Sequence, residues 1–340
     1  MSDNGRGIRR RTTRTGFRYL DSDGRTIRDA GKLVRIKSLV IPPAWREVWI
    51  SPFTESHLQA TGRDARGRKQ YRYHDRWRES RDDAKYARLI AFAKALPRIR
   101  ARVSRDFRKP VLSRDRVLAT VVRLLESCLF RVGNEKYARD NHSFGLTTLR
   151  DKHTTIRGTK LQFEFQGKSG KPHRIEIEDP RLAAAVKSCR DLPGRDLFQY
   201  LDEGGECHGI SSSDVNAYLR EASGGNFTAK DFRTWAGTVT VAAALSGLPP
   251  FDSRAEAKKN IVQAIESVAK RLGNTPAVCR KSYIHPAVLE AYVNGVTIRH
   301  SAMRSRKSVE AAVVALLRKQ LTAVKPDLRR ELAASLRAGQ

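Results

Sequence analysis

The stretch Lys160-Leu-Gln-Phe-Glu-Phe-Gln-Gly-Lys-Ser-Gly-Lys-Pro-His-Arg-Ile-Glu-Ile-Glu178 decides the fold class of this 340-residue chain. Its first half alternates between apolar and polar residues, which places Phe163 and Phe165 on one face of a β-strand. The alternation returns in the second half at Ile175 and Ile177. The Gly-Lys-Ser-Gly-Lys segment between the two halves has the composition of a tight turn. The stretch therefore predicts a β-hairpin.

Helical periodicity surrounds this hairpin. Apolar residues recur at intervals of three and four from Tyr86 to Leu96 and from Arg114 to Phe130. Helical patterns resume near Pro180 and continue to the end of the chain. We therefore predict a mostly α-helical domain over residues 83–340 that contains one small hairpin or sheet.

The first part of the chain has a different pattern. Short apolar and aromatic runs predict strands at Phe17–Leu20, Leu33–Ile36, Trp45–Ile50 and Lys69–Tyr73. Asp21-Ser-Asp-Gly24 is typical of a turn, and the polar segment 78–83 has little to bury. The sequence thus predicts a small strand-rich domain over residues 1–82 and an α+β fold for the whole chain.

The balance of charge points to the partner. The chain has 66 Lys plus Arg against 36 Asp plus Glu, which gives a formal net charge of +30. Hydrophobic residues make up 40% of the chain, more than a disordered basic tail would contain. A folded protein with this field is expected to bind a polyanion.

Several classes of protein do not fit the sequence. No run approaches the roughly 18 apolar residues of a transmembrane helix, and the N-terminus lacks the apolar core of a secretory signal. We therefore expect a cytoplasmic protein without a membrane partner. Cys128, Cys189, Cys207 and Cys279 form no C-x-x-C pair, so we expect free, buried thiols.

Two segments resemble cofactor sites only superficially. Gly167-Lys-Ser169 ends like a phosphate-binding loop, but Gln162 stands where that motif requires Gly. Five residues of one segment could be imagined as a metal cluster, yet the glycines among them favour a solvated loop; they are Asp202, Glu203, Glu206, Cys207 and His208. We expect no cofactor and no metal.

Four basic or tyrosyl segments carry the functional prediction. They are Phe130-Arg-Val-Gly-Asn-Glu-Lys-Tyr137, the turn at Lys168, Lys230-Asp-Phe-Arg-Thr-Trp-Ala-Gly237 and Gly273-Asn-Thr-Pro-Ala-Val-Cys-Arg-Lys-Ser-Tyr283. Each alone has an ordinary interpretation, such as a surface arginine, a turn lysine or a helix start with Thr275 as N-cap and Pro276 behind it. In this order and spacing they resemble the type IB DNA topoisomerases, particularly the compact poxvirus-like and bacterial form.

The resemblance covers nearly the whole chain. Gly62-Arg-Asp-Ala-Arg-Gly-Arg-Lys-Gln-Tyr-Arg-Tyr73 and Thr154-Thr-Ile-Arg-Gly-Thr-Lys160 also look like that family. It implies relaxation of positive and negative supercoils through a 3′-phosphotyrosyl intermediate, without ATP or metal. It also implies a monomer that clamps double-stranded DNA between two domains, and a catalytic domain related to that of tyrosine recombinases.

The resemblance also assigns roles in cleavage. A phosphodiester concentrates negative charge on its oxygens in the transition state, so cations must already be in place. Arg131 and Arg233 suit the non-bridging oxygens because their guanidinium groups stay charged. Asn274 stands where the poxvirus-like enzymes commonly have His. The asparagine keeps a hydrogen-bond donor at this position but removes the imidazolium charge.

Three further residues complete the implied chemistry. Tyr283 is the nucleophile, although a phenol with an ordinary pKa near 10 must lose its proton to react. Lys168 is the general acid for the leaving 5′-oxygen, and repulsion from Lys171 favours release of its proton. Lys230 is a second contributor near the same oxygen.

Candidate DNA contacts lie in both predicted domains. The resemblance implies that Gln70, Tyr71 and Tyr73 reach base edges in the major groove. The alternative is that Tyr71 and Tyr73 pack one face of a strand. Tyr137 either contacts the DNA backbone near the active site or packs beneath it.

Two other functions remain open from the sequence. A tyrosine recombinase or integrase shares the arginine, lysine and tyrosine chemistry. The motif around its second arginine, however, typically reads His-x-x-Arg, whereas this chain has Lys230-Asp-Phe-Arg233. A non-catalytic nucleoid-associated protein would need only the charge of +30. It would leave the ordered motifs unexplained.

Overall fold

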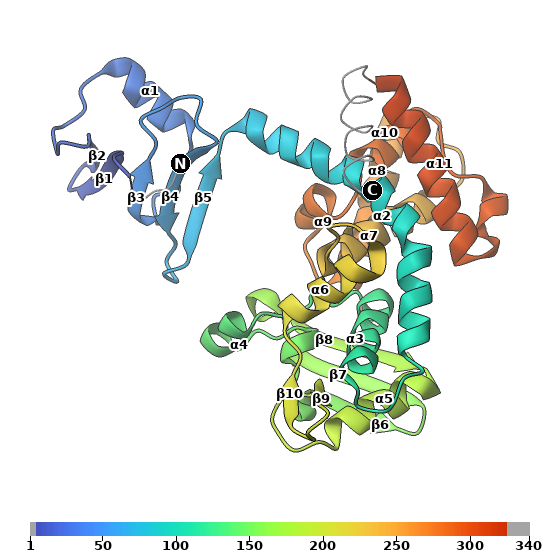
Figure 1. Cartoon of the computed structure of the whole chain (residues 1–340). Helices are drawn as coiled ribbons and strands as arrows, with labels where there is room; N and C mark the ends of the chain where they lie inside the picture. Colours follow the sequence, from blue (N-terminus) through green and yellow to red (C-terminus); the bar gives the residue numbers. More distant parts are fainter. Residues whose placement is uncertain (1–4, 325–340) are drawn as a thin grey trace. The chain divides into compact units, whose positions relative to one another are not determined.

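The computed structural model describes residues 5–324, without the side chains of residues 76, 78–85, 169 and 321–324. The chain divides into two compact units, an N-terminal unit (Met1–Lys85) and a C-terminal unit (Tyr86–Gln340) (Figure 1). Both contain antiparallel sheet, and about half of the chain is helical. The helix predicted beyond residue 324 lies outside the described residues.

The N-terminal unit is built on an antiparallel five-stranded sheet with strand order β2-β1-β3-β4-β5. Its elements are β1 (Ile8–Thr13), β2 (Gly16–Leu20), α1 (Ala30–Ser38), β3 (Arg46–Ile50), β4 (Leu58–Arg63) and β5 (Lys69–Tyr73). The core of the unit consists of Ile8, Ile36, Val48, Ile50 and Ala60. The strands predicted at 17–20, 45–50 and 69–73 are confirmed.

The strand predicted at Leu33–Ile36 is wrong, because these residues lie in α1. A four-residue apolar run does not distinguish a strand from a helical turn. Here Asp29 caps the helix, since its carboxylate accepts a hydrogen bond from the Lys32 amide at 2.7 Å. Ile36 is buried while Val34 is exposed, as the helical repeat requires. Neither β1 nor β4 was predicted, because half of β1 is arginine and β4 lacks regular alternation.

Helices form most of the C-terminal unit. They are α2 (Asp75–Asp106, which begins in the N-terminal unit), α3 (Arg114–Cys128), α4 (Glu135–Asn141), α5 (Pro180–Arg190), α6 (Ser212–Ser223), α7 (Ala229–Ser246), α8 (Arg254–Leu272), α9 (Pro276–Ser282), α10 (Pro286–Val293) and α11 (Arg306–Val324). Helix α2 includes the polar segment 78–83 that the sequence separated from the helical pattern. Three of the six residues in this segment are Arg or Glu, which favour helix without any apolar face, so periodicity alone misses this start.

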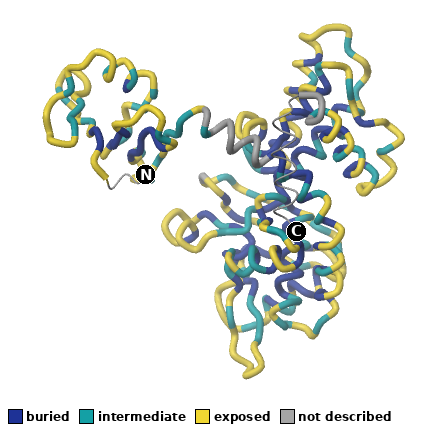
Figure 2. The backbone as a smooth tube through the Cα atoms, turned by 45° about the horizontal axis from the view of Figure 1, so that its top comes forward, coloured by how far each residue is buried: buried dark blue, intermediate teal, exposed yellow. Residues whose placement is uncertain are grey.

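The predicted hairpin is confirmed as β7 (Lys160–Gln166) and β8 (Pro172–Glu178), and β6 (Thr154–Arg157) extends it to three strands. Phe163 is fully buried and Phe165 nearly so, and Phe130 meets both rings edge-on. Figure 2 marks such buried positions in dark blue. This packing attaches the sheet to the core of the unit. The turn at its tip is a short 3₁₀ segment, Lys168–Gly170.

The segment between Asp202 and His208 is a second hairpin rather than a plain loop. Strands β9 (Gln199–Leu201) and β10 (Cys207–Gly209) pair around it. Cys207 is exposed there, so the expectation of a buried thiol is wrong at this position, whereas the other three cysteines are buried. Within residues 5–324, no helix has both the length and the apolar character that crossing a membrane requires.

Candidate active site

Side chains from four separate segments meet around one cavity of about 330 Å³ in the C-terminal unit. Its lining includes Arg131, Tyr137, Lys168, Lys230, Arg233 and Tyr283. These residues lie up to 152 positions apart in the sequence, between Arg131 and Tyr283. The fold therefore gathers the predicted catalytic side chains, except Asn274, around a single space.

Tyr283 lies directly after the short helix α9. The predicted helix start is confirmed, because the Thr275 hydroxyl accepts a hydrogen bond from the Val278 amide at 3.3 Å and Pro276 follows in the first turn. The Tyr283 amide closes the helix by donating to the Cys279 carbonyl at 2.9 Å. Helix α7 passes close behind, since a Cβ on Gly237 would lie only 2.4 Å from the Tyr283 carbonyl oxygen. The backbone of Tyr283 is thus held from two sides.

The phenol of Tyr283 lies in a strongly positive environment. The residue is 9% exposed, and the Arg233 guanidinium carbon lies 5.0 Å from the centre of its ring. Burial opposes ionisation, but the charges of Arg233, Arg131 and Lys230 and a hydrogen bond with Arg233 outweigh it. The pKa of Tyr283 therefore falls below its ordinary value of 10.

Arg233 is 3% exposed and joins the ends of two helices. Its Nη1 donates to the Leu129 carbonyl at the end of α3, and its Nη2 donates to the Leu272 carbonyl at the end of α8 at 2.8 Å. Carbonyls at helix C-termini carry partial negative charge and lack helical partners. Burial lowers the pKa of Arg233, but a guanidinium remains protonated in proteins. Its buried Nε has no hydrogen-bond partner among the described residues.

Asn274 orients Arg131 rather than lining the cavity. Its Oδ1 accepts a hydrogen bond from Arg131 Nη2 at 2.6 Å, and its Nδ2 donates to the Leu272 carbonyl at 3.3 Å. The predicted hydrogen bond from Asn274 to a phosphate stays a prediction. Arg233 also donates a hydrogen bond to the Leu272 carbonyl. The side-chain amide of Asn274 therefore links Arg131 to Arg233 through this shared carbonyl.

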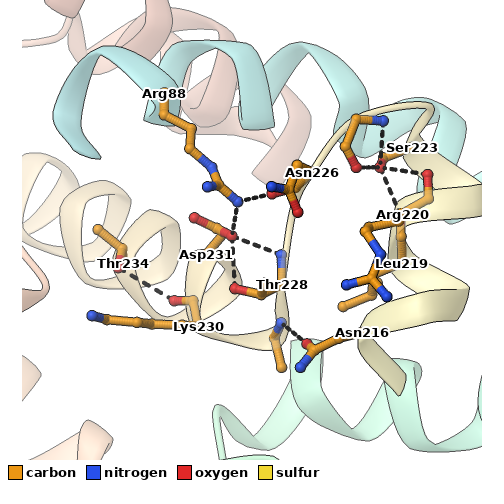
Figure 3. A network of polar contacts seen from close by, with 12 residues as sticks. Arg88, Asn216, Leu219, Arg220, Ser223, Asn226, Thr228, Lys230, Asp231 and Thr234 are labelled. Carbon is orange, nitrogen blue, oxygen red and sulfur yellow. Dashed lines mark hydrogen bonds and ion pairs between the residues drawn. The ribbon is translucent and has the colours of Figure 1, made fainter. Parts of the chain in front are cut away.

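Lys230 stands on a firmly anchored first turn of α7 (Figure 3). The Asp231 carboxylate accepts hydrogen bonds from the amide and hydroxyl of Thr228, at 2.7 and 3.0 Å. Arg88 of α2 pairs with the same carboxylate at 3.1 Å and also donates to the Asn226 carbonyl. In Figure 3 the Lys230 side chain extends away from this network. The anchoring fixes the backbone and leaves the ammonium available.

Lys168 and Tyr137 border the cavity from more exposed positions. Lys168 lies at the tip of the β7–β8 hairpin, where the Gly167 amide donates to the Lys171 carbonyl at 2.8 Å. Tyr137 is 48% exposed in the first turn of α4, whose N-cap Asn134 accepts a hydrogen bond from the Tyr137 amide. Both side chains can therefore meet a ligand that enters from solvent.

The other predicted DNA contacts lie on β5 of the N-terminal unit. The Gln70 amide donates to the Asp64 carboxylate at 3.0 Å. The rings of Tyr71 and Tyr73 are parallel, with centres 6.0 Å apart, and Tyr73 stacks on Trp77. The two tyrosines therefore pack on one face of the strand, while Tyr71 remains 46% exposed. Their contact with base edges stays a prediction.

The β9–β10 hairpin brings together side chains that the sequence placed in a solvated loop. Asp202, Glu206 and His208 each offer a ligand-type atom, and these atoms lie within 4.8 Å of one another. His208 Nε2 lies 2.7 Å from Asp202 Oδ2, so the two side chains form an exposed hydrogen-bonded pair. None of the three lines the cavity at Tyr283.

Comparison with known proteins assigns both parts of the chain. The family model for the catalytic core of eukaryotic DNA topoisomerase I matches residues 74–309, and the model for the N-terminal domain of bacterial DNA topoisomerase IB matches residues 16–64. DNA topoisomerase 1B of Acanthamoeba polyphaga mimivirus is 35% identical over 295 residues, 85% of this chain and 88% of the viral protein. DNA topoisomerase 1B of Vaccinia virus (strain Copenhagen) is 27% identical over 255 residues, 72% of this chain and 75% of that protein.

Proposed function

Since the chain belongs to the type IB DNA topoisomerases, we propose that it relaxes supercoils by cutting one DNA strand with Tyr283, allowing rotation, and resealing the strand. The observation that carries this mechanism is the buried phenol of Tyr283 beside Arg233 in a cavity lined by further cations. A group with a lowered pKa in such a cavity is suited to act as a nucleophile.

The proposed cleavage exchanges one phosphodiester for another. The Tyr283 oxygen loses its proton to solvent and attacks phosphorus, so a bond from phosphorus to the phenol oxygen forms. The bond from phosphorus to the 5′-oxygen breaks, and that oxygen takes a proton from Lys168. The products are a 3′-phosphotyrosyl enzyme and a 5′-hydroxyl strand end. Because the ester bond is conserved, resealing requires no nucleotide hydrolysis.

Positive charge around the phosphorus lowers the barrier. Arg131 lines the cavity and can donate to the non-bridging oxygens, with Asn274 fixing its orientation. Arg233 contributes its charge and its Nε, to which no described residue binds, while its other nitrogens hold the helix ends. We propose that Asn274 also donates to the phosphate when DNA is bound.

An alkoxide is a poor leaving group and needs a proton as it departs. Lys168 borders the cavity from the exposed hairpin tip, which suits delivery of a proton to a bound strand. Lys230, on the anchored first turn of α7, is proposed to assist near the same 5′-oxygen. Torsion stored in the DNA then drives rotation in either direction before the 5′-hydroxyl attacks the phosphotyrosine.

We further propose how the protein holds DNA. A monomer with domains 1–82 and 83–340 clamps the duplex, with Gln70, Tyr71 and Tyr73 at base edges and Tyr137 at the backbone near the break. The catalytic domain is proposed to share its fold with tyrosine recombinases. Its substrate would place the enzyme in the cytoplasm, on the nucleoid if the source is bacterial.

Relaxation of plasmid DNA tests the proposal. Negatively and positively supercoiled plasmids would be incubated with the full chain in EDTA without nucleotide, and Tyr283→Phe would be compared with Tyr200→Phe, which changes a tyrosine of the β9–β10 hairpin. We expect the wild type and Tyr200→Phe to relax both plasmids, and Tyr283→Phe to bind DNA without relaxing it. Relaxation by Tyr283→Phe would remove this residue as the nucleophile.

A further inference from the structure

His173 lies beside the active-site cavity on strand β8 but has no part in the chemistry above. It pairs with Phe165 across the hairpin, and the two rings stack with centres 5.2 Å apart and planes 16° apart. Phe130, directly before Arg131, meets the imidazole edge-on at 6.1 Å. The ring is therefore fixed on one side by aromatic packing.

The other edge of the imidazole touches two glycines. A Cβ on Gly167 would lie 2.5 Å from Cδ2 and Nε2 of His173, and a Cβ on Gly273 would lie 2.2 Å from its Cε1. Real Cβ atoms do not approach other atoms so closely, so the ring occupies the space that a side chain at either position would need. Gly167 directly precedes Lys168, and Gly273 directly precedes Asn274.

The role of the ring is packing rather than hydrogen bonding or charge. Among the described residues, neither ring nitrogen of His173 forms a hydrogen bond to another protein group. Burial, followed by the charges of Arg131, Arg233 and Lys171, lowers the pKa of His173. The neutral imidazole that results can approach these cations without adding repulsion.

We propose that His173 is a positioning residue that holds the Lys168 hairpin against the Asn274 loop. The inference rests on the proposed roles of these two residues. On one side, the ring fixes Gly167 and therefore the start of the turn that carries Lys168. On the other, it fixes Gly273 and so Asn274, whose Oδ1 accepts the hydrogen bond from Arg131. One imidazole thus sets the spacing between the general acid and the phosphate-binding arginine.

A leaving-group experiment tests this role in the full chain. Single-turnover cleavage would be measured on a normal DNA strand and on one with a 5′-thiolate leaving group, which needs no general acid. Because displacement of about 1 Å can cost on the order of 100-fold in rate, we expect His173→Ala to slow cleavage of the normal strand roughly 10- to 100-fold. We expect a clearly smaller loss with the thiolate. Equal losses on both strands would overturn the positioning of Lys168.

A compensating substitution separates positioning from general loss of stability. Gly167 has φ of −91°, a conformation open to alanine, so the only obstacle to Gly167→Ala is the clash with the imidazole. We expect Gly167→Ala alone to slow cleavage of the normal strand. In the double variant with His173→Ala, the added methyl group should cost no further activity because the ring is gone. Additive losses would contradict the contact.

Two controls distinguish this inference from the proposed function. Lys168→Ala must slow cleavage of the normal strand more than cleavage of the 5′-thiolate strand. If it slows both equally, the general-acid role fails, and the inference about His173 fails with it. If Lys168→Ala discriminates but His173→Ala does not, only the role of His173 is overturned. Should His173→Ala fail to fold, Gly167→Ala alone still decides, because it removes no side chain from the core. Discrimination between the strands by Gly167→Ala supports the inference, and wild-type rates overturn it.

Discussion

Arg233 combines two tasks in one side chain. Two of its nitrogens bind carbonyls at the ends of α3 and α8, and its charge lies over the ring of Tyr283. A buried cation that is tied to helix ends cannot move away when the phenol ionises, so little reorganisation is needed. The same group therefore shapes the site and favours ionisation of the Tyr283 phenol.

This arrangement predicts the pH dependence of Tyr283. Since its pKa lies below 10, the phenolate fraction rises with pH at lower values than for an ordinary tyrosine. Removal of the Arg233 charge by Arg233→Gln favours the neutral phenol and must shift the titration to higher pH. Ultraviolet difference titration of each protein against its Tyr283→Phe counterpart would follow this one ionisation without catalysis. An unchanged or lower midpoint in Arg233→Gln would refute the electrostatic argument.

The general-acid role of Lys168 predicts a dependence on the leaving group. Lys168→Ala should slow cleavage of a normal strand by about 10²- to 10⁴-fold, the usual contribution of proton transfer. A 5′-thiolate leaves without a proton, so its cleavage should slow much less. Lys160→Ala, which changes an exposed lysine at the far end of β7 from this turn, is the matched control and should affect both strands equally. Equal slowing of both strands by Lys168→Ala would argue against the role.

At the scale of elements, the close approach of α7 to Tyr283 predicts that a larger residue at Gly237 is not tolerated. Alanine normally stabilises a helix interior relative to glycine by about 1 kcal/mol. At Gly237 the added methyl group would lie 2.4 Å from the Tyr283 carbonyl, so the packing clash should outweigh propensity. We expect Gly237→Ala to slow cleavage and lower stability by about 1–3 kcal/mol.

The control for this prediction lies at the C-terminal end of the same helix. At Gly247, which caps α7, the nearest atom to an added Cβ is 3.6 Å away, an ordinary contact. Gly247→Ala should therefore retain wild-type cleavage rates in the same single-turnover assay. Comparable losses in both variants would show that the effect belongs to α7 as a whole and not to its contact with Tyr283.

Elements long enough to show a repeating pattern of apolar residues were predictable from the sequence, and shorter elements were not. The hairpin at 160–178 follows its alternation, and the two helices after residue 86 follow their periodicity. The run at Leu33–Ile36 was too short to show a period, and its helix depends on the cap at Asp29. The early start of α2 was missed because its first turns follow composition rather than an apolar stripe.

The site was predictable where motifs supplied the chemistry. Tyr283, Arg131 and Lys168 do border one cavity, as their joint role requires. The contacts that hold them were not predictable, because they join residues far apart in the sequence. The imidazole of His173 against Gly273 is an example, since neither residue carries a local signal for the other.

For the whole molecule, the net charge of +30 predicts strongly salt-dependent binding. Each phosphate that a cation neutralises releases counterions, so affinity falls with a slope of about −0.9 per phosphate on logarithmic axes. A clamp that makes about 6–10 such contacts should lose roughly 10³- to 10⁵-fold in affinity between about 50 and 200 mM salt. Titration of Tyr283→Phe with duplex DNA measures this without cleavage. A slope near −1 or −2 would be incompatible with a clamp.

The distribution of cysteines has a practical consequence for labelling the protein with a fluorescent dye. Cys128, Cys189 and Cys279 are buried, whereas Cys207 is exposed on the β9–β10 hairpin and takes no part in lining the cavity. A maleimide dye should therefore attach to the natural chain at one place, with no cysteine removed beforehand. That single fluorophore offers a reporter for following individual enzyme molecules along DNA while the residues that line the cavity stay unchanged.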